Sequence, residues 1–441
     1  MIEQIAGLSE ERQMIVETAR EFTMKEVLPV ANQLDPQEGE IPMELRDKLA
    51  DMGYFGIRLP EKYGGSGLGC FEYCLISEQL ARGWMSVASI VARGNGTLTS
   101  DLLSEEQKAQ ILPKVCTGDY LGAMSLSEPE TGSDLASISC RAVKEKDGWR
   151  ITGNKYWCTF ADGADYILLF ARTQSEIVSD KKHLGISAFL INKKRGELPE
   201  HVKGSPIPKI GYFGWKTYEL AFDGLLLPSN ALIGEEGKAF YALAKGLDEA
   251  RAHTAARSIG LAQGALEDAI NYAEQRIQFG SPISGFQDVR FKIARMATEI
   301  EAARRLLYHV CDCIDSGERC DKEASMVKYF ASEMSERVTS EALQILGGAG
   351  YTKLHAVERY WRDARLTKIF EGTSEIQLRI ISDNILLNFS FHPKTCKVNS
   401  FKFFLSAFCL SIKIPSLSIK PNIFSSFNIL SPKAIGVLVL I

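Results

Sequence analysis

The chain has 441 residues, of which 45% are apolar and 24% charged, so it is long enough to form two or three domains with a substantial core. A net charge of -4 argues against nucleic-acid binding, which needs a clustered basic face. The six histidines show no metal-ligand spacing, the ten cysteines contain no Cys-x-x-Cys pair, and no apolar run is long enough to span a membrane. We therefore expect no metal site, reduced thiols and a cytoplasmic location.

The first 117 residues are predicted to form a helical domain. Ser9 can cap a first helix, whose apolar positions recur on one face and which we expect to end at Pro29. The glycine-rich run 60–69 follows no strand and precedes no Lys-Ser/Thr pair, so we interpret it as a structural turn and not as a phosphate loop. Further helical patterns cover Pro42–Gly53, Tyr73–Leu103 and Glu105–Val115.

Residues 118–233 are predicted to form a β-domain, because short apolar or alternating runs alternate there with Gly, Asp, Asn and Pro. Long helical periodicities return over residues 234–387, as in a helical bundle. The predicted fold is therefore α+β, with a β-domain between two helical domains.

Residues 388–441 differ in composition from the rest of the chain. From Asn384 onward there is no Asp, Glu or Arg but there are six lysines, so the first 383 residues carry a net charge of -10. Four prolines interrupt any long helix. This tail is interpreted as a disordered extension; a basic membrane-surface segment and a partner-binding arm are the alternatives.

The stretch 362–377 contains the candidate catalytic residue, Glu371, between Phe370 and Gly372. Gly372 followed by Thr373, Ser374 and Glu375 is also typical of a plain turn and helix start. Ile369 and Phe370 could form an apolar wall that raises the pKa of the Glu371 carboxyl, which would suit a general base.

Phe-Glu-Gly-Thr-Ser-Glu-Ile-Gln, preceded by Gln-Ile-Leu-Gly-Gly-Ala-Gly at 344–350, resembles the carboxy-terminal signature of the FAD-dependent acyl-CoA dehydrogenases. The resemblance runs from about Glu10 to about Leu386 through several ordered motifs. It implies an N-terminal helical domain, a barrel-like middle β-domain and a C-terminal four-helix bundle.

The resemblance also implies sites for FAD. In the run 124–134, Ser127 would bond the flavin ring and Ser133 would also touch CoA, while Trp157 would cover a flavin face and Thr159 would bond the reactive nitrogen. Arg276 would contact the FAD pyrophosphate of a neighbouring subunit, which implies at least a dimer. The resemblance further implies a dimer of dimers. The other residues implied at the cofactor are Met124, Leu126, Phe279, Gln287, Gln344, Gly347, Gly348, Thr373 and Glu375.

The acyl-CoA site is implied at Asp248, Arg251 and Gly372, with Arg251 near the base; from spacing alone Asp248 and Arg251 would form a surface ion pair. A minority of the family carries its base at the position of Ala250, and alanine cannot remove a proton. Glu371 is therefore the expected base, with a flavin as hydride acceptor and an electron-transfer flavoprotein as partner. Arg93 is predicted either to bind a distal carboxylate, as in methylsuccinyl-CoA, or to lie at the surface.

Two alternative functions remain open from the sequence. One is a flavin oxidase or monooxygenase of the same fold, in which oxygen takes the electrons. The other is a non-catalytic nucleic-acid-binding relative, which only the basic tail supports.

Overall fold

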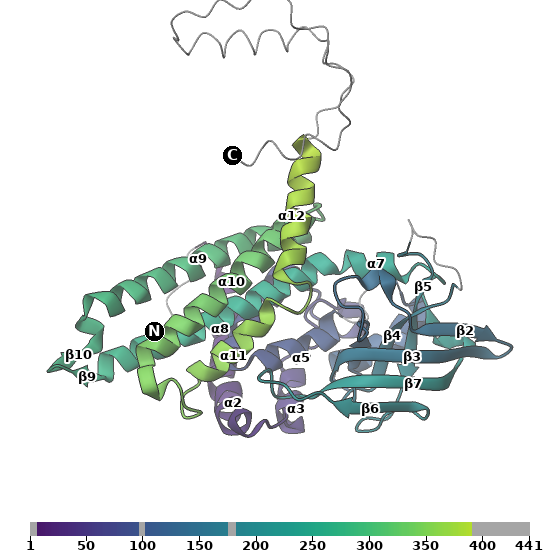
Figure 1. Cartoon of the computed structure of the whole chain (residues 1–441), viewed down its shortest axis with the longest axis horizontal. Helices are drawn as coiled ribbons and strands as arrows, with labels where there is room; N and C mark the ends of the chain where they lie inside the picture. Colours follow the sequence, from purple (N-terminus) through teal and green to yellow (C-terminus); the bar gives the residue numbers. More distant parts are fainter. Residues whose placement is uncertain (1–6, 97–101, 175–181, 390–441) are drawn as a thin grey trace, which may run out of the picture. The chain divides into compact units, whose positions relative to one another are not determined.

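The computed structural model describes residues 7–96, 102–174 and 182–389 (Figure 1). The described residues up to Ile385 belong to one compact unit. Most of the predicted tail, 390–441, lies outside the described residues. Within the described ranges, no helix combines the length and the apolar character needed to cross a membrane.

The N-terminal part is helical, as predicted. Ser9 caps the first helix, since its Oγ accepts from the Arg12 N–H at 3.2 Å. The expected end of this helix at Pro29 is wrong, because five π-helical residues (Thr23–Val27) follow it and Pro29 lies in the first turn of the next helix, where its missing N–H needs no partner. The helices are α1 Glu10–Phe22, α2 Leu28–Leu34, α3 Met43–Asp51, α4 Cys70–Gly83, α5 Met85–Asn95 and α6 Glu105–Cys116.

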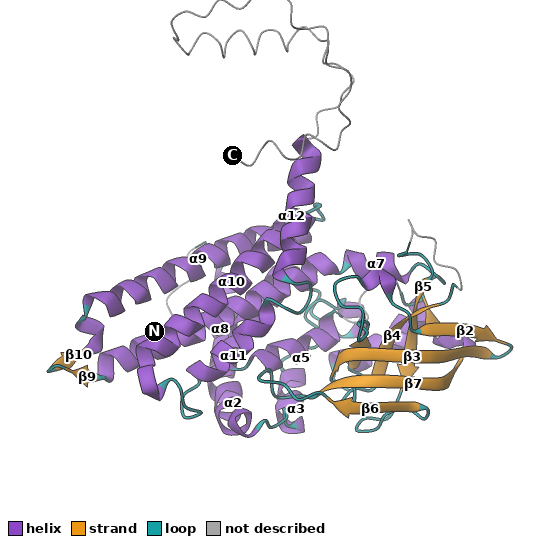
Figure 2. Cartoon of the chain, in the orientation of Figure 1, coloured by secondary structure: helices purple, strands orange, loops and turns teal. Residues whose placement is uncertain are grey.

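The middle part is a sheet of eight strands, with β6-β7-β3-β2-β4-β5-β8 in spatial order and β1 beside β4 (Figure 2). The long antiparallel pair β3–β7 carries two register shifts, one of them between Lys155 and Cys158. The strands are β1 Gly122–Ser125, β2 Arg141–Glu145, β3 Gly148–Thr159, β4 Tyr166–Arg172, β5 Ile186–Asn192, β6 Val202–Pro206, β7 Thr217–Pro228 and β8 Leu232–Ile233.

The C-terminal part is a helical bundle in which α8 packs against α4, α9, α10 and α11. A small hairpin, β9 Ile277–Gln278 and β10 Ser281–Pro282, joins α8 to α9. The helices are α7 Ala239–Lys245, α8 Leu247–Gln275, α9 Gln287–Asp315, α10 Asp321–Leu346, α11 Val357–Thr367 and α12 Ser374–Phe389. One-turn 3-10 helices lie at Asp35–Gln37, Glu61–Tyr63, Leu135–Ser137, Ser229–Ala231, Ile283–Gly285 and Gly347–Ala349.

The eight cysteines in the described ranges are free thiols, and seven of them are buried. The Sγ atoms of Cys70, Cys74 and Cys311 lie within 4.8 Å of one another between α4 and α9. Cysteine spacing along the sequence does not reveal this group, because Cys311 comes from a helix far along the chain.

Candidate functional site

Glu371 lies on a tight turn between α11 and α12. Glu371 has φ 53° and Gly372 has φ 87°, so two successive residues are left-handed. Thr373 then caps α12, since its hydroxyl accepts from the Ile376 N–H at 3.3 Å. The predicted kink and helix start are both present, and the turn directs the Glu371 side chain toward α8.

Both carboxylate oxygens of Glu371 are hydrogen-bonded. The Arg257 Nη2 lies 2.8 Å from each of them, and the Thr254 hydroxyl donates to Oε2. The expected apolar wall is wrong: Ile369 is 52% exposed, and the Phe370 ring lies against the Arg257 guanidinium, 4.8 Å away. The carboxylate is thus paired with a buried guanidinium, since α8 presents an arginine where an apolar face was expected.

Lys328 of α10 supports the same turn from the other side. Its side chain is fully buried, and its Nζ donates to the Gly372 carbonyl at 2.6 Å. Gln377 Nε2 donates to the same oxygen at 3.0 Å. Burial lowers the pKa of Lys328 to about 8. The lysine interrupts the apolar run of α10, which was the only sequence signal for it.

Asp248 and Arg251 form the predicted pair at the start of α8, with Arg251 Nη1 2.6 Å from Asp248 Oδ1. The pair is not a surface one, because Arg251 is only 7% exposed, and burial raises the pKa of Asp248. The arginine on Glu371 is Arg257, not Arg251. Arg257 and Thr254 were not predicted from the sequence. Arg257 could have been noticed, because it is a charged residue within the most apolar segment of α8.

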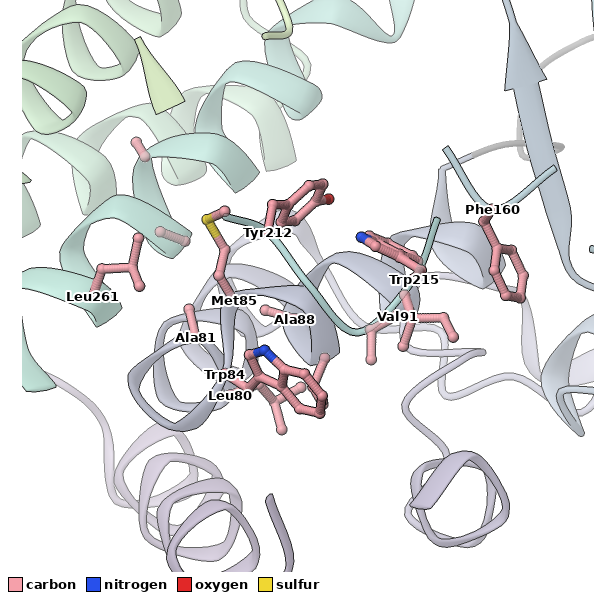
Figure 3. Close-up of a cluster of buried hydrophobic side chains, with 14 of the residues drawn as sticks. Leu80, Ala81, Trp84, Met85, Ala88, Val91, Phe160, Tyr212, Trp215 and Leu261 are labelled. Atoms are coloured by element: carbon pink, nitrogen blue, oxygen red, sulfur yellow. The ribbon is translucent and has the colours of Figure 1, made fainter. Parts of the chain in front are cut away.

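Arg93 of α5 lies beside the loop 211–215. Its guanidinium is 5.1 Å from the Trp215 ring, and its Nε is buried without a hydrogen-bond partner. No carboxylate in the described ranges forms an ion pair with it. In Figure 3, Tyr212 and Trp215 extend from this loop over α5. Arg93 is therefore half-buried, with its Nε buried and the Trp215 ring beside its guanidinium.

The residues predicted along the flavin ring come together at the end of β3. The Tyr156 N–H donates to the Ser127 carbonyl at 2.8 Å, so the strand-to-loop segment that includes Met124 and Leu126 runs beside β3. Buried Lys155 fixes this segment, because its Nζ donates to the Leu126 carbonyl at 2.8 Å and to Glu128 at 2.9 Å.

Trp157 occupies the register shift of β3 with φ 63° and is 56% exposed. Thr159 Oγ1 lies 3.1 Å from Thr217 Oγ1, and Ser133 is exposed in the loop after β1. Ring contacts lead from Phe160 through Trp215 and Tyr212 to Phe370, which connects the β3 end to the Glu371 turn.

Of the remaining predicted cofactor residues, Thr373 and Glu375 lie beside Glu371 at the start of α12, whereas Arg276 and Phe279 follow the far end of α8. Thr254 and Gln275 are 21 residues apart on this helix, which corresponds to roughly 30 Å at 1.5 Å per residue. Phe279 is 96% exposed, and a Cβ on Gly347 or Gly348 would meet nothing within 4 Å. Arg276, Gln287 and Gln344 are also exposed. One chain therefore presents these residues away from Glu371.

Three family models match the chain: acyl-CoA dehydrogenase, N-terminal domain over residues 9–119, middle domain over 123–225 and C-terminal domain over 237–386. The chain belongs to the acyl-CoA dehydrogenase family. The expected fold and enzyme class are confirmed, and the non-catalytic alternative is not supported.

The chain is similar to several members of this family. It is 39% identical over 382 residues to an acyl-CoA dehydrogenase of Bacillus subtilis (strain 168), covering 86% of this chain and 99% of that one. It is 40% identical over 391 residues to the (2S)-methylsuccinyl-CoA dehydrogenase of Cereibacter sphaeroides, covering 86% and 70%. It is 37% identical over 382 residues to the caffeyl-CoA reductase-Etf complex subunit CarC of Acetobacterium woodii, covering 86% and 99%. Among solved structures, butyryl-CoA dehydrogenase from Megasphaera elsdenii matches with a TM-score of 0.79 at 33% identity, covering 87% and 100%.

FAD is the cofactor of this family, and the residues present fit it. The exposed Trp157 ring offers a flat apolar surface, and the Ser127 and Thr159 hydroxyls offer hydrogen bonds beside it. When bound, FAD supplies the hydride acceptor of a dehydrogenation.

Proposed function

We propose that the enzyme desaturates a short or branched acyl-CoA thioester between its α- and β-carbons, with Glu371 as the base that removes the α-proton. The observation that supports this role is the orientation of the carboxylate: the left-handed turn holds it against α8, and its side chain is still 34% exposed. The fold thus positions a carboxylate that stays open on one side to a ligand, as the base of this reaction must be.

The same turn offers a donor for the thioester carbonyl. The backbone N–H of Glu371 donates no hydrogen bond to any residue in the described ranges. We assign it to the thioester oxygen, where charge develops as the α-proton leaves. Lys328 and Gln377 hold the next carbonyl, that of Gly372, and so keep this N–H in place.

Glu371→Gln tests the base. The substitution keeps the shape and removes the proton acceptor, so flavin and acyl-CoA binding should persist while anaerobic flavin bleaching falls by several orders of magnitude. Asp248→Asn is the matched comparison, because Asp248 is a partly buried carboxylate at the predicted acyl-CoA site. Bleaching by Glu371→Gln within tenfold of wild type, with a large loss in Asp248→Asn, would move the base to Asp248.

We further propose that the acyl group carries a distal carboxylate, which Arg93 binds. A buried guanidinium nitrogen without a partner is unfavourable unless an anion is bound, and a methylsuccinyl-CoA enzyme is among the relatives. Arg93→Met should lower kcat/KM for methylsuccinyl-CoA by an amount that corresponds to about 2 to 4 kcal/mol of activation free energy. The kcat/KM for butyryl-CoA should stay nearly unchanged. Equal losses for both esters would refute this role.

Electrons are proposed to pass to an electron-transfer flavoprotein, which is supported by the similarity to an Etf complex subunit. Slow reoxidation of the reduced enzyme in air, and fast reoxidation by such a flavoprotein, would distinguish this route from an oxidase. Arg276, Phe279, Gln287, Gln344, Gly347 and Gly348 are proposed to reach the FAD of a neighbouring subunit, because they lie far from Glu371 within one chain.

A further inference from the structure

The proposed base is fully engaged by protein groups. Arg257 Nη2 lies 2.8 Å from both Glu371 oxygens, and the Thr254 hydroxyl occupies Oε2 as well. A carboxylate held in this way is a poor proton acceptor, because it must give up these bonds before it can take a proton. Glu371 therefore has to leave the ion pair for catalysis.

Glu371, and not Arg257, is the partner that can move. Arg257 is 1% exposed, its Nη1 donates to Ser89 Oγ at 2.8 Å, and it lies against the Phe370 ring. Glu371 is one-third exposed on a two-residue left-handed turn. The arginine is thus a fixed anchor for a carboxylate that is free on its solvent side.

Other cationic side chains lie near this pair. Ser89 and Arg93 lie one helical turn apart on α5, so the Ser89 hydroxyl that binds Arg257 is on the same face as the second guanidinium. Burial, and then the charges of both arginines, keep the pKa of His253 well below its ordinary value, so this histidine is neutral. Burial also raises the pKa of Tyr212 and Tyr73, which stay protonated. Lys328 adds further positive charge behind Gly372.

We propose that Arg257 is a positioning residue that keeps Glu371 in an ion pair in which it cannot act as the base. The distal carboxylate of the substrate then displaces Glu371 from Arg257. In a four- or five-carbon dicarboxylyl group the distal carboxylate is separated from the α-carbon by two or three bonds of about 1.5 Å, so we place it between Arg93 and Arg257, within reach of the guanidinium that holds the base. It then competes with Glu371 for Arg257, and the freed Glu371 takes the α-proton. This inference rests on the proposed role of Glu371 as the base.

The test compares anaerobic flavin reduction by methylsuccinyl-CoA and by butyryl-CoA in the FAD-loaded enzyme. In Arg257→Gln the base is no longer held, so butyryl-CoA should react at least threefold faster and the methylsuccinyl-to-butyryl rate ratio should fall about tenfold or more. Arg304→Gln, which removes a buried guanidinium that pairs with Glu78 between α9 and α4, should leave the ratio within about twofold.

A second arm uses only the wild type and so does not depend on the folding of a variant. Propionate added to the butyryl-CoA reaction supplies the missing carboxylate, and it should accelerate flavin reduction in a saturable way where sodium chloride of equal ionic strength does not. An unchanged ester ratio in Arg257→Gln, equal losses for both esters, or no effect of propionate would overturn the inference. A wild type that reduces its flavin with neither ester would instead refute the proposed function.

Discussion

Replacing Lys328 with methionine tests how the protein holds the Glu371 turn. The Lys328 ammonium is fully buried against the Gly372 carbonyl, and burial lowers its pKa from 10.5 to about 8. A lysine in the unfolded chain keeps its ordinary value. Between pH 8 and 10.5 the unfolded state therefore binds more protons than the folded state, so the free energy of unfolding rises with pH across this window.

The size of this effect follows from the two pKa values. Between pH 7 and pH 9.5 the wild type should gain about 2 kcal/mol over Lys328→Met, which has no titrating group at this position. Urea unfolding followed by circular dichroism at both pH values, with equal excess FAD, measures the change.

Lys368→Met is the control for this experiment. Hydrogen bonds to Glu333 and Glu336 raise the pKa of Lys368, so its contribution is lost only above pH 10.5 and stays constant in the tested range. A wild-type advantage over Lys328→Met that changes by less than about 0.5 kcal/mol between the two pH values would refute the reasoning.

Three further predictions follow from the geometry. Gly372→Ala should lower turnover at least tenfold, because φ is 87° and the added Cβ would lie 2.5 Å from Gln377 Nε2; steady-state rates check this. Arg276→Ala should weaken FAD retention and the oligomer together, which gel filtration with flavin absorbance measures. An unchanged oligomer that keeps its FAD would refute the proposed intersubunit contact. Deletion of residues 390–441 should leave flavin content and activity intact, since the family match ends at residue 386; loss of flavin on deletion would show a structural role.

Local features of the site could be predicted from the sequence. The turn at Gly372 and the cap at Thr373 depend on residues within a few positions, so the sequence pattern was sufficient for both. The Asp248–Arg251 pair is similarly local, and only its burial was misjudged. The end of the first helix at Pro29 was wrong because a proline also suits the first turn of a following helix.

Partners that come from tertiary packing could not be predicted in this way. Arg257 precedes Glu371 by 114 residues, and Lys328 belongs to a third helix. The hydrophobic periodicity of α8 and α10 does not predict that both helices contact the Glu371–Gly372 turn. The apolar neighbours of Glu371 in sequence therefore suggested an apolar environment, whereas the fold places a guanidinium and an ammonium there.

The charges of Arg257 and Arg93 need an explanation, because an apolar side chain would be the ordinary choice beside an acyl group. Burying a guanidinium is unfavourable unless an anion accompanies it, and removal of that anion leaves an uncompensated charge. Glu371 compensates Arg257, but among the described residues no carboxylate compensates Arg93, whose Nε has no partner. An apolar residue at this half-buried position would leave no buried nitrogen without an acceptor. The position is better explained by a ligand that brings its own negative charge, and the same charge is the one that can compete with Glu371 for Arg257. Substrate selection and activation of the base would then depend on one carboxylate.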